Sequence, residues 1–174
     1  MARKYNDQSV APIIAVDFDG TITTADTYPR INALRRYVKE CLNFLEDIGV
    51  KVVIYTSRDV AIDQDTYEVH DDITPMINFL HDNDIKFSAV NKSIQFCPFK
   101  YNARKVYAHM YVDDKAYGWV ESACAFIYPF HDFLVGICGI TGQDADNICA
   151  MITRGESLEQ YIAPLAEHIR NFWV

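Results

Sequence analysis

The sequence predicts an α/β fold, in which a parallel sheet of about five strands is flanked by helices. Two observations predict it. Short apolar runs alternate along the chain with stretches whose apolar residues recur every three or four positions, as strand–helix–strand units require. Several apolar runs also end in acidic or hydroxyl side chains, which is typical of strands that deliver functional groups to the carboxyl edge of a parallel sheet.

The first elements follow in order from the amino terminus. Pro12 to Val16 is a short apolar run that precedes two acids, and it predicts the first strand. Ile31 to Ile48 has helical spacing of its apolar residues, and Gly49 offers a C-terminal cap. Val50 to Tyr55 is rich in β-branched residues and predicts the second strand.

The middle of the chain is less uniform. Asp59 to Asp72 is too acidic to be buried and predicts a loop with at most one helical turn. Thr74-Pro75 opens a helix, because proline is tolerated in the first turn. Ile85 to Val90, Met110 to Val112 and Ala123 to Tyr128 are apolar runs that predict the third, fourth and fifth strands.

The rest of the chain predicts extra C-terminal helices. Helical spacing of apolar residues extends over residues 148–169, and Ser157 with Gln160 forms a plausible capping box for the last helix. Repeats, low-complexity segments and linkers are absent from the sequence. We therefore expect residues 1–174 to form one domain, with a core over about 11–130 and a helical extension over about 131–174.

Composition and charge exclude some classes of protein. No stretch reaches the roughly 18 uninterrupted apolar residues that a membrane-spanning helix needs, and the first residues lack the apolar segment of a signal peptide. We expect a cytoplasmic protein that does not bind membranes. A net charge of −8 disfavours a partner such as nucleic acid, whereas a small phosphorylated substrate remains compatible, because a bound cation can reverse the local sign.

Reactive side chains follow three of the predicted strands. They are Asp17-Phe18-Asp19-Gly20-Thr21, Thr56-Ser57-Arg58 and Asp113-Asp114. Residues i and i+2 of an extended chain point the same way, so Asp17 and Asp19 can face one space. Carboxylates this close repel each other unless a proton or cation lies between them, and their hard oxygen atoms suit Mg²⁺.

These residue types indicate phosphoryl transfer. Asp17 would attack phosphorus as a nucleophile, and Asp19 would protonate the leaving oxygen and later deprotonate water. Thr56 would donate a hydrogen bond to the phosphoryl oxygens, and a lysine would neutralise the charge that develops on them. The expected function is a Mg²⁺-dependent phosphohydrolase that cleaves phosphate monoesters through an aspartyl-phosphate.

The three motifs in this order resemble those of the haloacid dehalogenase superfamily of phosphatases, over roughly Ile13 to Tyr128. The resemblance implies a Rossmann-like sheet, with Asp17 as nucleophile and Asp19 as acid and base. It also implies that the Asp17 carboxylate, the Asp19 backbone carbonyl and an acid of the Asp113-Asp114 pair bind the metal. We favour Asp114 as the direct ligand, with Asp113 acting through water or from outside the ligand set.

The remaining site residues are assigned with alternatives. Lys105 is the preferred catalytic lysine, since the resemblance implies a lysine shortly before the Asp-Asp strand, and Lys92 and Lys100 compete with it. Arg58 could clamp a substrate phosphate or pair with the acidic loop. The other residues expected to border the substrate are Gly20, Thr21 and Ser57.

The spacing of the motifs leaves no room for a large cap domain. At most a small lid could be built from residues 59–72 or 91–104. An open site would admit bulky substrates or be closed by a second subunit, so a homo-oligomer stays open. Two other functions also stay open: a phosphatase acting on 3′ ends of nucleic acids, and a catalytically silent binding module of the same fold. A nucleotide is the first guess for a small substrate, by resemblance alone.

Overall fold

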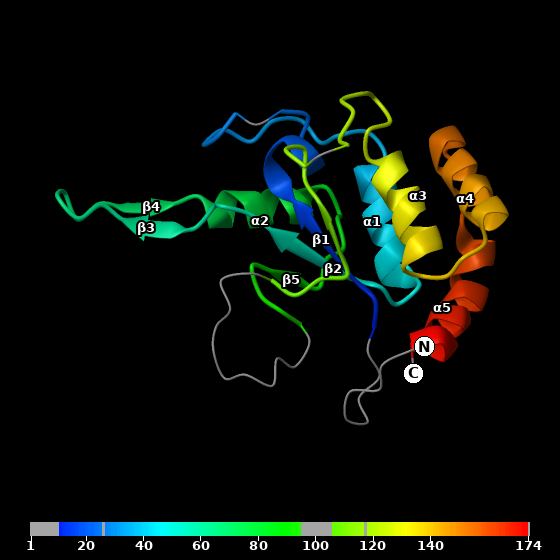
Figure 1. Ribbon diagram of the computed structural model, residues 1–174. Coiled ribbons are helices and arrows are strands. Elements are labelled where there is room, and N and C mark those ends of the chain that lie inside the picture. Colours follow the sequence, from blue (N-terminus) through cyan, green and yellow to red (C-terminus); the bar gives the residue numbers. More distant parts are fainter. Residues whose placement is uncertain (1–10, 26, 95–105, 117, 174) are drawn as a thin grey trace.

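A four-stranded parallel sheet lies at the centre of the computed structural model (Figure 1). The structure describes residues 11–25, 27–94, 106–116 and 118–173. The strands lie in the order β5-β2-β1-β6, and they are β1 (Ile13–Asp17), β2 (Lys51–Tyr55), β5 (Ala89–Val90) and β6 (Met110–Val112). The predicted α/β class and its Rossmann-like parallel sheet are therefore confirmed.

The strand order places a switch point beside β1. From β1 the chain moves to β2 and then to β5 on one side, and β6 pairs with β1 on the other side. Asp17 is level with Tyr55 of β2, and Val16 is level with Val112 of β6. Ligand sites of open parallel sheets lie in the crevice outside the carboxyl ends of the strands at such a point.

Helices supply most of the larger hydrophobic core. They are α1 (Val38–Asp47), α2 (Ile73–Asp82), α3 (Ile127–Gly136), α4 (Gly142–Arg154) and α5 (Glu159–Trp173). Each contributes side chains to the cluster that also contains Val16 of β1 and Ile54 of β2. A smaller cluster holds Ile13 and Val53, whose side chains point to the opposite face of the sheet. Within the described parts of the chain, none of these helices is long and apolar enough to cross a membrane.

The predicted fifth strand at Ala123 to Tyr128 is wrong. Residues 123–126 form turns, and α3 begins at Ile127. The apolar run is ambiguous by itself, but the buried residues Phe126, Phe130, Phe133 and Leu134 recur with helical spacing. Pro129 fits because it lies in the first turn of α3. Among the described residues the parallel sheet has four strands rather than five.

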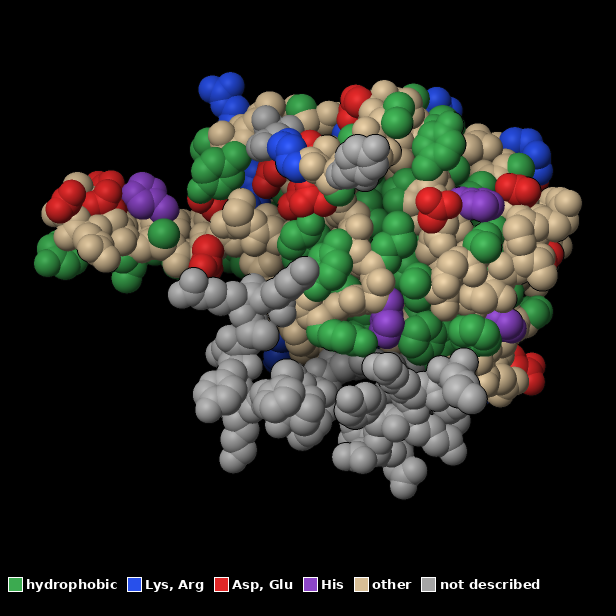
Figure 2. Space-filling model, in the orientation of Figure 1, with side chains coloured by type: hydrophobic (Ala, Val, Ile, Leu, Met, Phe, Trp, Pro, Cys, Tyr) green, Lys and Arg blue, Asp and Glu red, His purple; other side chains and the backbone are tan. Residues whose placement is uncertain are grey.

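The predicted acidic loop at Asp59 to Asp72 is also wrong. It forms an antiparallel hairpin of β3 (Val60–Ile62) and β4 (Val69–Asp71), which extends away from the body in Figure 1. The side chains of Val60, Ile62 and Val69 are 50%, 62% and 64% exposed. Figure 2 shows hydrophobic side chains along one side of this hairpin and acidic side chains on the other. Alternation of this kind is typical of a strand pair rather than a loop.

Two predicted elements are shorter than expected. The helix predicted over Ile31 to Ile48 begins only at Val38, and the strand predicted over Ile85 to Val90 is reduced to Ala89–Val90. The residues before α1 instead run beside the loop that follows β1. There the N–H of Thr24 donates to the carbonyl of Ala33 at 2.9 Å. Tertiary hydrogen bonds have overridden the local helical pattern.

Candidate functional site

Three strand ends bring the candidate residues to one edge of the sheet. Asp17 is the last residue of β1, Thr56 follows β2, and Asp113 follows β6. Since β1 lies between β2 and β6, these residues stand side by side at the switch point. The sequence motifs that were expected to meet there do meet there.

The acids Asp17, Asp113 and Asp114 form a cluster in which one carboxylate oxygen from each lies within 4.8 Å of the others. The pKa of Asp17 is raised to about 7, chiefly by burial and then by the negative charges of Asp113 and Asp114, while a hydrogen bond from the Phe18 backbone lowers it. A divalent cation among these oxygens would oppose both effects, because it favours the ionised carboxylate. These three carboxylates are close enough together that one hard cation could contact all of them.

The oxygen atoms of the Asp113-Asp114 pair differ in what they contact. Asp113 accepts the Tyr55 hydroxyl on Oδ2 at 2.6 Å and the N–H of Lys115 on Oδ1 at 2.7 Å. Asp114 Oδ1 is buried and, among the described residues, has no hydrogen-bond partner. A buried carboxylate oxygen without a donor is costly unless a cation contacts it. Asp114 thus suits direct coordination, whereas Asp113 is oriented by its neighbours, which is the arrangement that we favour from the sequence.

Tyr55 is expected to support metal binding through its hydroxyl group. Replacing Tyr55 with phenylalanine removes the donor that orients Asp113, and we expect Mg²⁺ affinity to fall about 10-fold or more, as for other groups that orient metal ligands. Calorimetric titration with Mg²⁺ checks this. The matched control is Tyr111→Phe, since Tyr111 packs edge-on against Tyr55 but donates its hydroxyl to the Val106 carbonyl. Equal affinities in the two variants would contradict the role of Tyr55.

The turn after β1 depends on Gly20. This turn, η1 (Phe18–Ile22), is non-helical at Asp19 and Gly20, and Gly20 has a φ of +83°. A Cβ atom on Gly20 would lie 2.4 Å from Asp114 Oδ2. The glycine therefore allows both the left-handed backbone and the close approach of the two loops.

Gly20→Ala is expected to destabilise the protein by roughly 2–4 kcal/mol. Alanine is strained at this positive φ, and its methyl group would clash with the Asp114 carboxylate. Urea denaturation measures the loss. Gly49→Ala is the control, as it shares a positive φ but a Cβ there meets nothing within 4 Å. Equal losses in the two variants would mean that contact with Asp114 contributes nothing.

A buried arginine that the sequence analysis missed holds this turn in place. Arg35 donates to the carbonyl oxygens of Gly20 at 2.6 Å and Thr21 at 3.0 Å. It also pairs with Glu121 at 2.6 Å and lies over the Trp119 ring. Arg35 therefore ties the loop after β1 to the loop after β6. It falls inside a stretch that reads as helix, so no signal in the sequence distinguishes it from a solvated arginine.

Arg58 is placed differently from both expectations. The carboxylate that it pairs with belongs to Asp19 rather than to Asp59 or another acid of the acidic loop. The Nε and Nη2 atoms of Arg58 donate to the two carboxylate oxygens of Asp19 at 2.7 and 2.6 Å. The interaction with Asp19 raises the pKa of Arg58 above its ordinary value. The candidate acid and base is thus held in a bidentate ion pair.

The hydroxyl residues of the motifs have separate environments. Thr21 is fully buried, where its hydroxyl donates to Asp17 Oδ2 at 3.4 Å and accepts the N–H of Asp114 at 2.8 Å. It links the two acids instead of lining an open surface, so its expected role in binding substrate is corrected. Thr56 is partly exposed and is fixed by Asn91, whose side chain accepts the Thr56 N–H at 2.8 Å. Ser57 is exposed beside it.

The lysine candidates are only partly placed. Lys105 and Lys100 lie outside the described residues, and Lys92 is exposed after β5. Lys115, which the sequence analysis did not consider, lies with its Nζ 2.6 Å from Asp114 Oδ2. Its position directly after the Asp113-Asp114 pair is the signal that could have identified it.

Comparisons with known proteins agree with the fold. No protein-family model matches this chain, and no curated protein matches it. A solved structure described as the conserved protein coded by a locus from Bacteroides thetaiotaomicron is similar, with a TM-score of 0.53 and 21% sequence identity. The match covers 88% of this chain and 99% of that chain. At this identity the likeness shows the α/β fold alone.

Proposed function

We propose that this chain is a magnesium-dependent phosphohydrolase that cleaves phosphate monoesters through an aspartyl-phosphate on Asp17. The main support is the acid cluster at the switch point, where Asp17 ends β1 and the buried Oδ1 of Asp114 has no hydrogen-bond donor among the described residues. Carboxylates in this arrangement repel each other unless a proton or a cation is bound between them. The cluster also lies where parallel sheets bind their ligands.

The residues present fit Mg²⁺. Asp17 and Asp114 would supply carboxylate oxygens, the Asp19 carbonyl would supply a third ligand by resemblance, and Asp113 would be oriented from outside the ligand set. When bound, the cation would offset the negative charge that the nucleophile and the phosphate bring together. Oxygen ligands of this kind are those that Mg²⁺ prefers.

Asp17 begins the reaction. One carboxylate oxygen of Asp17 forms a bond to phosphorus while the bond from phosphorus to the ester oxygen breaks, and the electron pair of that bond leaves with the ester oxygen. Asp19 supplies the proton that the leaving oxygen takes up. The Thr56 hydroxyl and a lysine would donate hydrogen bonds to the phosphoryl oxygens.

Asp19 then acts in the opposite direction. Water attacks phosphorus, its proton passes to Asp19, and the bond between phosphorus and the Asp17 oxygen breaks with its electrons returning to Asp17. The products are inorganic phosphate and the regenerated carboxylate. Asp19 therefore gives up one proton and takes one back in each cycle.

The proposed substrate is a small phosphorylated molecule. A nucleotide stands first on the resemblance alone, and the net charge of −8 disfavours a nucleic-acid substrate. Insertion between β2 and α2 is limited to the β3–β4 hairpin, so no large cap is formed there.

Phosphate release from an aryl phosphate tests the proposed function. We expect hydrolysis that requires Mg²⁺, stops when the metal is chelated and resumes when it is added back. Lys39→Met, which removes a surface ammonium group that pairs with Asp84, should depend on Mg²⁺ as the wild type does. Hydrolysis that continues at full rate after chelation would contradict the proposed role of the acid cluster.

A further inference from the structure

The side chain of Arg58 is enclosed at the edge of the candidate site, with an exposure of 1%. Its two hydrogen bonds to Asp19 form a bidentate fork, in which the planar guanidinium fixes the plane of the carboxylate. The orientation of Asp19 therefore depends on what holds Arg58.

The loop of residues 27–30, here called the flap, holds Arg58 from the other side. Arg58 donates to the carbonyl oxygens of Pro29 at 3.0 Å and Arg30 at 3.3 Å. Its guanidinium also lies 5.2 Å from the centre of the Tyr28 ring and 5.4 Å from that of Phe18. Two aromatic rings and two carbonyl groups leave the guanidinium little freedom to turn.

The flap is joined in turn to the base of the β3–β4 hairpin. The Tyr28 hydroxyl donates to a carboxylate oxygen of Asp72, the residue that follows β4. The N–H of Asp72 donates to the carbonyl of Asp59 at 3.1 Å, which closes the hairpin at its base. A continuous chain of contacts thus runs from Asp19 through Arg58 and Tyr28 to Asp72.

We propose that Arg58 is a positioning residue that orients the Asp19 carboxyl group for proton transfer, and that the flap fixes the orientation of Arg58. The proposal rests on the proposed function, since it concerns the acid and base of that reaction. The fork occupies one lone pair on each oxygen of Asp19, so a second lone pair on each stays available to carry or receive the proton.

This role fits the contacts of Arg58 better than binding of substrate phosphate. A guanidinium has five N–H donors. Four hydrogen bonds already join Arg58 to Asp19, Pro29 and Arg30. A substrate phosphate would have to displace Asp19 or the flap before it could form its own fork.

Two substrates with different leaving groups separate positioning from general structural damage. Dinitrophenolate leaves without a proton, whereas phenolate from phenyl phosphate needs one, so only phenyl phosphate depends on the acid. For Arg58→Lys, which keeps the charge but loses the fork, we expect kcat/KM at one fixed pH to fall about 30-fold on phenyl phosphate and less than about 3-fold on dinitrophenyl phosphate.

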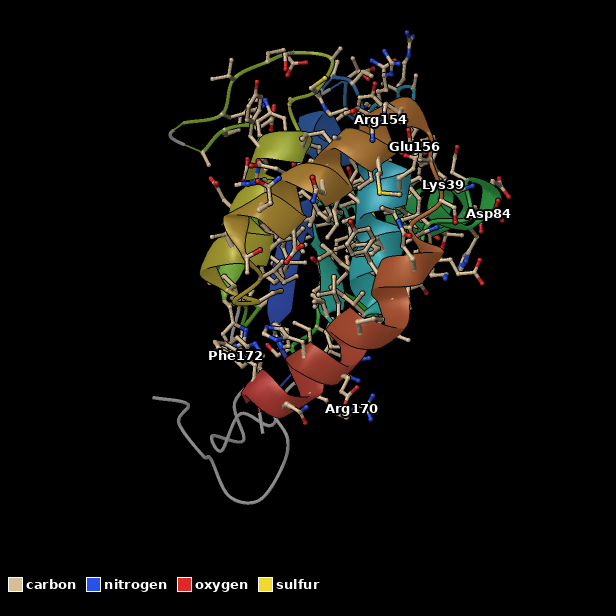
Figure 3. The ribbon with its side chains drawn as sticks, turned by 90° about the vertical axis from the view of Figure 1, so that its right-hand side faces the viewer. Lys39, Asp84, Arg154, Glu156, Arg170 and Phe172 are labelled. Carbon is tan, nitrogen blue, oxygen red and sulfur yellow. The ribbon has the colours of Figure 1, made fainter. Side chains whose placement is uncertain are left out.

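A double-mutant cycle then tests whether Arg58 acts through Asp19. In an Asp19→Asn background, Arg58→Lys is expected to change the ratio of the two kcat/KM values by less than about 2-fold, because the group that it aims is gone. Lys39→Met is the matched control. The Nζ atom of Lys39 forms a surface ion pair with Asp84 Oδ2 at 3.1 Å, on the face shown in Figure 3. This variant should leave both values unchanged.

Several outcomes would overturn the role of Arg58. Equal losses on the two substrates, or the same loss with Asp19 already replaced, would show that Arg58 only supports the fold. If Arg58→Lys does not fold, Tyr28→Phe is tested in its place. We then expect kcat/KM to fall about 3-fold on phenyl phosphate and to stay unchanged on dinitrophenyl phosphate. An unchanged ratio of the two kcat/KM values would reject the proposal. A wild-type chain that hydrolyses neither substrate would instead reject the proposed function.

Discussion

Asp17→Asn is expected to lower kcat/KM for phosphate monoesters by about 10⁴-fold or more, because an amide oxygen cannot serve as the nucleophile. The asparagine side chain has nearly the same size as aspartate, and it does not titrate. Phosphate release at saturating Mg²⁺ measures the loss, and circular dichroism verifies that the fold is kept.

The matched control for this variant is Asp132→Asn, which removes one carboxylate from the surface of α3. It changes the net charge by the same amount and should retain wild-type activity. Substantial hydrolysis by Asp17→Asn would show that a group other than Asp17 attacks phosphorus, and would contradict the proposed mechanism.

The second large effect concerns stability in the absence of metal. The folded-state pKa of Asp17 is raised to about 7 from an ordinary value of 3.8, chiefly by burial. A raised pKa means that the folded protein binds the proton more tightly than the unfolded chain. The contribution to stability is therefore full below pH 4 and is lost as the pH rises through 7, by at most about 4 kcal/mol.

A cation is expected to reverse this loss. Mg²⁺ binds the ionised acids, so its stabilising effect should grow as the pH rises from 5.5 to 8. At a Mg²⁺ concentration about 100 times its dissociation constant, we expect Tm to rise by roughly 5–10 °C at pH 8 and by much less at pH 5.5. Thermal denaturation with Mg²⁺ and with a chelator at each pH measures the difference.

Asp17→Asn provides the decisive comparison for this experiment. Without metal at pH 8 the variant should be more stable than the wild type, since a buried charge is gone, and it should respond weakly to Mg²⁺. Asp132→Asn should behave as the wild type does. A wild-type Tm that ignores Mg²⁺ at both pH values would contradict a cation site at this cluster.

The central strands could be predicted closely from the sequence. Each of the strands β1, β2 and β6 is a short apolar run with a polar end, and the observed bounds differ from the predicted ones by at most one residue. The acids at those ends could be placed together because carboxyl ends of parallel strands share one edge of the sheet. This part of the site needs only local pattern and topology.

Other elements could not be predicted because their patterns suit two structures. The run from Ala123 to Tyr128 is as apolar as a buried strand, and only the buried phenylalanines beyond it reveal α3. The acidic stretch from Asp59 to Asp72 forms a hairpin whose strand residues are largely exposed. Strands that are not buried need no apolar run, so the sequence pattern did not mark them.

The partners of the buried arginines could not be predicted from the sequence for a different reason. Arg58 and Arg35 each reach residues on separate loops, and which acid or carbonyl they meet depends on tertiary placement. A long side chain carries no directional signal in the sequence. The expectation that Arg58 would face the substrate or the neighbouring acids failed on this ground.

The most direct test of the central claim is a crystal structure with Mg²⁺ and beryllofluoride, which mimics a phosphoryl group on a carboxylate. We expect beryllium bonded to an oxygen of Asp17 and Mg²⁺ coordinated by Asp17 and Asp114, with Asp113 held by Tyr55 outside the ligand set. Beryllofluoride bound to a different side chain, or Mg²⁺ bound away from Asp17 and Asp114, would contradict it.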